Sequence, residues 1–139
     1  MVSSEERFEF HATLNHLDEG LETLHDSVQR LRESIGRGPD DRNLMLFETA
    51  LAEIGANVLT HGRPAGDDHQ IEYALWTERQ AALASFVDQG PPVHDLLNRG
   101  MPDPLSESGR GLAMANSLLD ELGYRRDGEL NRWRLVKRL

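Results

Sequence analysis

The sequence predicts a two-layer α/β (α+β) sandwich, in which a mixed, mostly antiparallel sheet is covered on one face by about three helices. A chain of 139 residues with 38% hydrophobic residues has the length of a single domain with one sizeable core. Hydrophobic periods of two and of three to four residues follow one another in the order β-α-α-β-β-loop-α-β-β. This order favours helices gathered on one side of an antiparallel sheet and differs from the alternation of a Rossmann domain.

The first strand and the first two helices are indicated by the spacing of apolar residues. Residues 8–14 alternate between apolar and polar side chains, which is typical of a half-buried strand. Apolar residues then recur at steps of three and four over residues 17–35, and Gly36 ends that predicted helix. A second helix is expected from about Pro39-Asp40 to His61-Gly62. Its apolar stripe consists of Leu44, Phe47, Leu51, Ile54 and Val58.

Two strands are predicted next, around residues 70–76 and 80–88, joined in a hairpin by Thr77-Glu78-Arg79. The second strand is almost wholly apolar, which is typical of an interior strand buried on both faces. It delivers Asp88 into a turn that contains Gly90 and two prolines.

The remainder of the chain is expected to be a long connection, a helix and a hairpin. The connection is rich in proline, glycine and serine, and its length in so small a domain indicates a functional or mobile segment. The third helix should start at Gly109–Gly111, and the last hairpin should turn at Asp127-Gly128 ahead of a strand over 130–137. Trp76 and Trp133 are expected to be strand residues that pack on the sheet.

Composition excludes several classes of function. A net charge of −9 argues against general binding of nucleic acid or of anionic membranes. The absence of cysteine excludes disulfides and thiolate metal sites. No apolar run has the roughly 18 residues of a membrane span, and the N-terminus lacks a signal-peptide pattern, so we expect a cytoplasmic protein. A P-loop is absent, because the single lysine, Lys137, follows no glycine-rich run.

The end of the chain is locally basic. Residues 125–139 contain six Arg or Lys and two acidic residues. A solvated edge strand guarded by charges is the favoured interpretation, and a docking patch is the alternative.

Three short motifs contain the residues suited to chemistry. Glu53 and Asn57 lie one turn apart beside the apolar stripe of the second helix, where a polar pair by itself is usually a solvent-facing edge. Asp88-x-Gly90 by itself is an ordinary turn after a strand. Gly109-Arg110-Gly111 by itself is an ordinary helix start. Their occurrence together and in this order favours a functional site.

The ordered motifs resemble those of the Bergerat-fold ATPases, the GHKL family of gyrase-type topoisomerases, histidine kinases and anti-sigma factor serine kinases. Glu53-x-x-x-Asn57 with His61-Gly62 resembles the N-box, and Asp88-x-Gly90-x-Pro92 resembles the first glycine box. Glu107-Ser-Gly109-Arg110-Gly111-Leu112 resembles the second glycine box. The resemblance covers nearly the whole chain and is closest to the anti-sigma kinases, because these 139 residues leave no room for the dimerisation helices of a sensor kinase.

The resemblance implies that the chain, as one histidine-kinase-like ATPase domain over residues 1–139, binds ATP and Mg²⁺. Asp88 would accept a hydrogen bond from the adenine amino group, and Gly90 would let the backbone approach the base, with Pro92 beside it. Asn57 would be a Mg²⁺ ligand. Residues 93–108 would form an ATP lid. The phosphates would be bound by Gly109, Arg110, Gly111 and Leu112.

The resemblance further implies a serine/threonine protein kinase in which Glu53 accepts or orients the proton of the attacking hydroxyl. Such a protein switches between a sigma factor and an anti-anti-sigma antagonist, without direct contact with nucleic acid or membrane, and a homodimer is left open. The alternative is an adaptor that binds nucleotide and sequesters a partner without phosphoryl transfer. The sequence departs from many relatives at Arg63-Pro64, where an aromatic residue is common, and at Pro91-Pro92, where other Bergerat ATPases have a second glycine.

Overall fold

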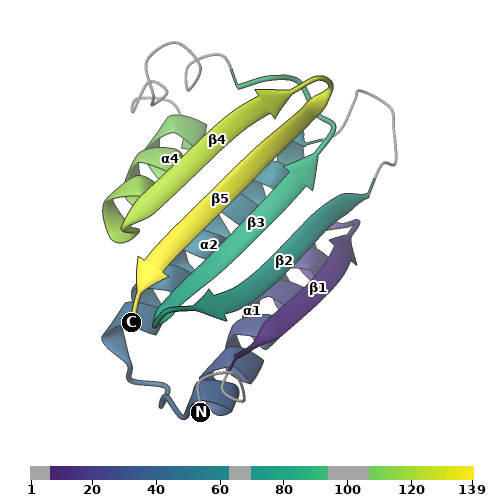
Figure 1. The fold of residues 1–139 in the computed structure, drawn as a ribbon. Coiled ribbons are helices and arrows are strands. Elements are labelled where there is room, and N and C mark those ends of the chain that lie inside the picture. Colours follow the sequence, from purple (N-terminus) through teal and green to yellow (C-terminus); the bar gives the residue numbers. More distant parts are fainter. Residues whose placement is uncertain (1–6, 63–69, 94–106) are drawn as a thin grey trace.

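The computed structural model describes residues 7–62, 70–93 and 107–139, with side chains in the last range from residue 110 (Figure 1). The described strands form one five-stranded sheet in the order β1-β2-β3-β5-β4, with antiparallel pairing between all neighbours. Their bounds are Glu9–Leu14 for β1, Ile71–Glu78 for β2, Ala81–Asp88 for β3, Glu121–Asp127 for β4 and Leu130–Arg138 for β5.

Three described helices lie on one face of this sheet, as Figure 1 shows from the opposite face. Their bounds are Leu17–Ile35 for α1, Arg42–His61 for α2 and Glu107–Leu118 for α4. The predicted two-layer α/β sandwich is therefore confirmed, and the sheet is antiparallel throughout its described strands. None of the described helices is long and apolar enough to cross a membrane.

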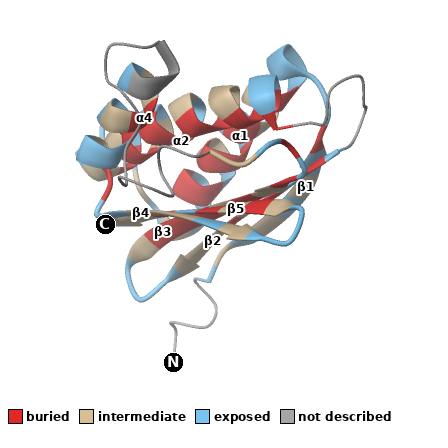
Figure 2. Ribbon diagram, turned by 90° about the horizontal axis from the view of Figure 1, so that it is seen from above, coloured by how far each residue is buried: buried red, intermediate tan, exposed pale blue. Residues whose placement is uncertain are grey.

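The core lies between the helix layer and the sheet (Figure 2). All five residues of the predicted α2 stripe are buried there, which fixes the orientation of α2 and places Glu53 and Asn57 at the margin of the core. Asp41 caps this helix, since its Oδ1 accepts a hydrogen bond from the backbone N–H of Leu44 at 3.0 Å. At the other helix, Gly36 adopts a left-handed conformation with φ of 71° and closes α1.

Two sequence expectations are corrected. The turn of the β2–β3 hairpin consists of Arg79 and Gln80, with φ of 48° and 62°, and not of residues 77–79. Two positive φ values in succession match the twist of the flanking strands, as in a type I′ turn, although neither residue is the usual Asn or Gly. The last strand is also not an edge strand: β5 lies between β3 and β4, so the two edge strands of the described sheet are β1 and β4.

Candidate functional site

The carboxylate of Asp88 is the most constrained polar group at the end of β3. Asp88 is 2% exposed, and three donors hold its two oxygens. Oδ1 accepts hydrogen bonds from the backbone N–H of Gly90 at 2.9 Å and from Nδ2 of Asn131 at 2.8 Å. Oδ2 accepts one from the indole N–H of Trp133 at 3.1 Å. A carboxylate has about four acceptor positions, so Oδ2 retains one for a further donor.

These donors explain why the protein tolerates a buried acid at this position. A carboxylate removed from water is costly unless it is hydrogen-bonded, and here the donors come from the turn after β3 and from the adjacent strand β5. They also fix the rotation of the carboxylate. The remaining acceptor position of Oδ2 therefore has a defined direction, which suits the recognition of a single donor group on a ligand.

Asn131 connects Asp88 to the rest of the C-terminal hairpin. It is 2% exposed, and its Nδ2 also donates to the carbonyls of Gly90 at 3.2 Å and Pro91 at 3.0 Å. Its Oδ1 accepts from the hydroxyl of Tyr124 at 2.5 Å and from Nη1 of Arg126 at 3.1 Å. One side chain thus ties the turn after β3 to both β4 and β5.

Two further contacts hold the same turn. Nη1 of Arg126 donates to the carbonyl of Gly90 at 2.8 Å. The backbone N–H of Val93 donates to the hydroxyl of Tyr124 at 2.9 Å. The turn that follows Asp88 is therefore built on the C-terminal hairpin, whose basic residues include at least one with a structural role at the site.

Sequence reasoning missed this hairpin as part of the site. Trp133 was expected to pack on the sheet, and it does pack in the core, but its indole N–H also bonds to Asp88. A usable signal was present at Asn131, which shares the inward-facing period of β5 with Trp133 and Leu135. An amide at an inward strand position requires buried partners, and this could have directed attention to β5.

Two glycines allow the end of α2 to touch the turn after β3. An ideal Cβ at Gly62 would lie 2.9 Å from both Cβ and Cγ of Asp88. A Cβ at Gly90 would lie 2.5 Å from the carbonyl oxygen of His61 and 2.7 Å from Cα of Gly62. The space beside Gly90 is thus taken by the end of α2. Approach of a base to Gly90 stays a prediction, whereas this close backbone contact explains the glycine directly.

Asn57 and Glu53 follow along α2 from that contact. With a rise of about 1.5 Å per residue, they lie roughly 7.5 Å and 13.5 Å back from Gly62 along the helix axis. Both side chains are half-buried, and neither is hydrogen-bonded to another described residue. An ideal Cβ at Gly111 would lie 2.7 Å from Oε1 of Glu53, so this carboxylate rests against the first turns of α4.

The residues of the second glycine box occupy different environments. The helix α4 begins at Glu107, two residues before the expected start. The N–H of Gly109, in its first turn, has no acceptor within the helix, and Gly111 lies beyond that turn. Leu112 is 3% exposed and belongs to the core, where its side chain is remote from solvent.

Other expected features are only partly visible. Pro92 lies half-buried in the turn after β3. Of the expected lid, residues 94–106 lie outside the described residues. Within the described part of the chain, no cluster of three or more His, Asp or Glu side chains is arranged for a metal ion. The site is therefore a row of polar groups, from Asp88 at the end of β3, which lies against Gly62, past Asn57, to Glu53 beside α4.

Comparison with solved structures finds this fold in two bacterial proteins. The structure of the RsbU and RsbW domains of Rv1364c from Mycobacterium tuberculosis matches with a TM-score of 0.68 and 21% identity, covering 95% of this chain and 32% of that chain. The Acinetobacter baumannii histidine kinase AdeS matches with a TM-score of 0.50 and 14% identity, covering 93% of this chain and 67% of that one. The chain thus spans about a third of the length of the first structure.

Comparison with curated protein sequences finds no match. Residues 14–137, however, match the family model described as a histidine kinase-like ATPase domain. This range runs from the last residue of β1 to the penultimate residue of β5 and includes the whole row of polar groups. The chain therefore belongs to the histidine kinase-like ATPase domain family.

Proposed function

We propose that the protein is an ATP- and Mg²⁺-binding serine/threonine protein kinase of the anti-sigma type. The observation that carries the proposal is the fixed carboxylate of Asp88, with one acceptor position left, at the end of a row that leads to Glu53 beside α4. Membership of the histidine kinase-like ATPase family supports the nucleotide, and the motifs of the chain support the anti-sigma type.

Adenine is the base that suits Asp88. Its exocyclic amino group is a donor that the remaining acceptor position of Oδ2 can accept. Guanine presents a carbonyl at that position, so two acceptors would face each other. A buried group left unpaired in this way is the strongest source of discrimination between similar ligands. The rigid network around Asp88 would prevent the carboxylate from turning away.

The residues present fit a Mg²⁺ ion held jointly by protein and nucleotide. Mg²⁺ is bound by one or two protein oxygens and completes its octahedral shell with water and phosphate oxygens. The half-buried Asn57 offers one side-chain oxygen on the row between Asp88 and Glu53. Bound Mg²⁺ would neutralise charge on the transferred phosphoryl group.

Glu53 would act on the substrate hydroxyl. Its Oε atoms would accept the proton of a serine or threonine hydroxyl on the partner as that oxygen bonds to the terminal phosphorus of ATP and ADP departs. The contact with Gly111 would hold the carboxylate at the first turn of α4. The backbone N–H of Gly109 in that turn and the guanidinium of Arg110 would bind phosphate oxygens.

The partners follow from the proposed class. One would be a sigma factor, held in one state, and the other an anti-anti-sigma protein, phosphorylated in another. The fold shared with the RsbU and RsbW domain structure is compatible with this role. We infer a cytoplasmic location and a single domain over residues 1–139 from the same class.

The second candidate is an adaptor that binds nucleotide and sequesters a partner without transferring phosphate. The placement of the Glu53 carboxylate against Gly111 favours the enzyme, because a binder has no need for a positioned base. Incubation with γ-labelled ATP, Mg²⁺ and candidate antagonist proteins tests the proposal. Labelled serine or threonine on an antagonist supports the kinase, and ATP binding without any labelled partner supports the adaptor.

A further inference from the structure

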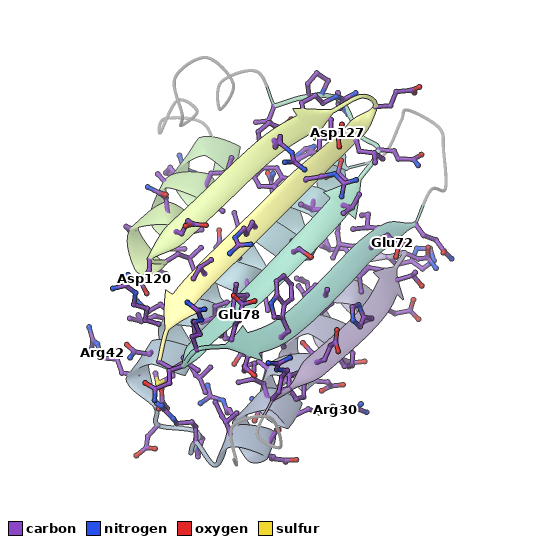
Figure 3. All side chains as sticks on the ribbon, viewed as in Figure 1. Arg30, Arg42, Glu72, Glu78, Asp120 and Asp127 are labelled. Carbon is purple, nitrogen blue, oxygen red and sulfur yellow. The ribbon has the colours of Figure 1, made fainter. Side chains whose placement is uncertain are left out.

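The end of the sheet farthest from Asp88 contains a hollow of about 530 Å³, which is within the range of pockets that bind small molecules. Ala81, which lines the hollow, lies at the start of β3, and Asp88 lies at its end. At about 3.3 Å per residue, the hollow is roughly 23 Å from Asp88. Figure 3 labels Glu78 at this end of the sheet and Asp127 at the other. The chain reaches the hollow at four places, with Arg7, with Ile35 and Arg37, with residues 77–81 and with Leu139.

The charge of this hollow is positive, although the chain as a whole has a net charge of −9. Its described lining residues include three arginines, Arg7, Arg37 and Arg79, and one acid, Glu78. The carboxylate of Glu78 accepts a hydrogen bond from the indole N–H of Trp76 at 3.2 Å. Among the described residues, neither Arg7 nor Arg79 has a hydrogen-bond or ion-pair partner. Two guanidinium groups at the hollow are therefore left for an anion.

Two of the three arginines are placed at the hollow by contacts of their own segments. Phe8, next to Arg7, donates its N–H to Oγ1 of Thr77 at 2.9 Å, and its carbonyl accepts from the N–H of Thr77 at 3.1 Å. Arg37 follows the end of α1, and its Nη1 donates to Oδ2 of Asp41 at 2.8 Å. These contacts bring charges from both ends of α1 to the hairpin between β2 and β3.

The third arginine has a backbone conformation that the fold alone does not require. Arg79 and Gln80 form the turn with φ of 48° and 62°, where residues with a Cβ are strained and Asn-Gly is preferred. The carbonyl of Gln80 accepts from the N–H of Leu139 at 2.8 Å, but any residue has that carbonyl. Both side chains are exposed and bond to no other described residue. Strained residues are concentrated at functional sites, so this strain indicates a role for the two side chains.

One wall of the hollow is apolar, and it decides what kind of anion fits. Ile35, Ala81 and Leu139 line the hollow and are all half-buried. We propose that the hollow binds a small phosphate monoester whose apolar body lies against this wall. Guanidinium groups form paired hydrogen bonds to phosphate oxygens, and a monoester has enough charge for both Arg7 and Arg79.

A phosphate monoester fits this hollow better than other anions do. A carboxylate has a single charge and would leave one of the two arginines without a counter-charge, whereas a monoester has a charge of about −1.5 to −2. Inorganic phosphate would leave the apolar wall uncovered. An acidic peptide distributes its charges at intervals of about 3.3 Å along an extended chain, whereas the arginines here converge on one hollow from separate segments.

Titration of the ¹⁵N-labelled protein with phenyl phosphate, followed by NMR, tests the proposal. We expect the amide signals of residues 77–81 to shift with a dissociation constant of about 1 mM, as for an efficient ligand of this size. Inorganic phosphate, which lacks the ring, and benzoate, which has one charge, should each bind about fivefold more weakly or worse. Asp88→Asn should bind phenyl phosphate like the wild type, because this change lies roughly 23 Å away. The test is therefore independent of the proposed kinase activity.

The variant Arg79→Asn/Gln80→Gly separates a binding role from a structural one. Both new residues suit the positive φ values of the turn, so the melting temperature should rise by about 2–6 °C. Phenyl phosphate should nevertheless bind about tenfold more weakly or worse, because one guanidinium is lost. The matched control is Arg42→Asn, which removes an exposed arginine at the start of α2, outside the hollow (Figure 3). It should leave the dissociation constant within about twofold of the wild-type value.

Several results would overturn the proposal. One is a wild type in which the signals of residues 77–81 stay in place at about 10 mM phenyl phosphate. Another is a variant with Arg79 and Gln80 replaced that binds as tightly as the wild type, or one that melts at a lower temperature. Inorganic phosphate that binds as tightly as phenyl phosphate would exclude the apolar body. Signals that shift only with an acidic peptide, such as tetraglutamate, would assign the hollow to a protein partner instead.

Discussion

Replacement of Asp88 by asparagine tests the recognition of adenine at a single atom. The amide oxygen of the new side chain can replace Oδ1 and accept from Gly90 and Asn131, at 2.9 and 2.8 Å in the wild type. Its NH₂ group then replaces Oδ2 and meets the indole N–H of Trp133, which donates at 3.1 Å. If the amide were turned the other way, its NH₂ group would face two donors, from Gly90 and Asn131, instead of one. Asp88→Asn therefore keeps two of the three hydrogen bonds to this side chain but turns the ligand-facing acceptor into a donor.

The expected magnitude follows from the lost bond. A hydrogen bond to a charged group contributes about 1.5–3 kcal/mol, which corresponds to roughly a ten- to hundredfold loss of ATP affinity. The unpaired indole N–H should lower the free energy of unfolding by about 1–3 kcal/mol as well. Isothermal titration with ATP and with inosine triphosphate measures the first effect. We expect the preference for ATP over inosine triphosphate to shrink or reverse, because inosine has a carbonyl at this position. An ATP affinity equal to that of the wild type, with the exposed Asp127→Asn as control, would refute the assignment of Asp88.

The remaining predictions concern two residues that hold the polar groups of the site and the N-cap of α2. Trp133→Phe keeps the buried ring but removes one donor to the carboxylate at the end of β3, so urea titration should show a loss of about 1.5–3 kcal/mol; an unchanged midpoint would contradict the role of its N–H. Gly111→Ala should raise the melting temperature through helix propensity, yet slow phosphoryl transfer about 10²-fold, because the new Cβ displaces the Glu53 carboxylate; a rate equal to wild type would show that this contact is unimportant. The hydrogen bond from Arg37, together with the capped backbone, lowers the pKa of Asp41, so its contribution to stability is complete above pH 3.8 and is lost as pH falls through the lowered value. The difference in unfolding free energy between wild type and Asp41→Asn should accordingly shrink on acidification from pH 5, and a difference that grows would contradict it.

The local spacing of apolar and polar residues was sufficient to predict the helices, the strands and the positions in the row of polar groups that lie on α2 and at the end of β3. The α2 stripe fixes how that helix packs, and Asn57 and Glu53 follow from it because residues four apart share a face. Asp88 was predictable because a buried strand ends in a turn with glycine and proline. The turn formed by Arg79 and Gln80 was predicted at the wrong residues, because neither of the two is the Asn or Gly that usually indicates a positive φ.

The supports of the site depend on contacts distant in sequence. Asn131 and Trp133 reach Asp88 from more than 40 positions away, through the pairing of β5 with β3. Local periodicity gives no strand order, so the sequence did not indicate that β4 is an edge strand and β5 is interior. The position of Glu53 against Gly111 likewise depends on the packing of α4 beside α2, which no spacing in the chain encodes.

The central claim is that Glu53 makes this domain a kinase and that binding of nucleotide does not depend on it. Glu53→Gln keeps nearly the same volume and leaves Asn57 and Asp88 in place. Phosphoryl transfer to the antagonist should fall by about 10²–10⁴, the usual contribution of a positioned base, while the dissociation constant for Mg·ATP stays within about threefold of the wild-type value. Asn57→Ala, in contrast, should weaken Mg²⁺-dependent binding as well as transfer. A Glu53→Gln protein that transfers phosphate at the wild-type rate would contradict the account.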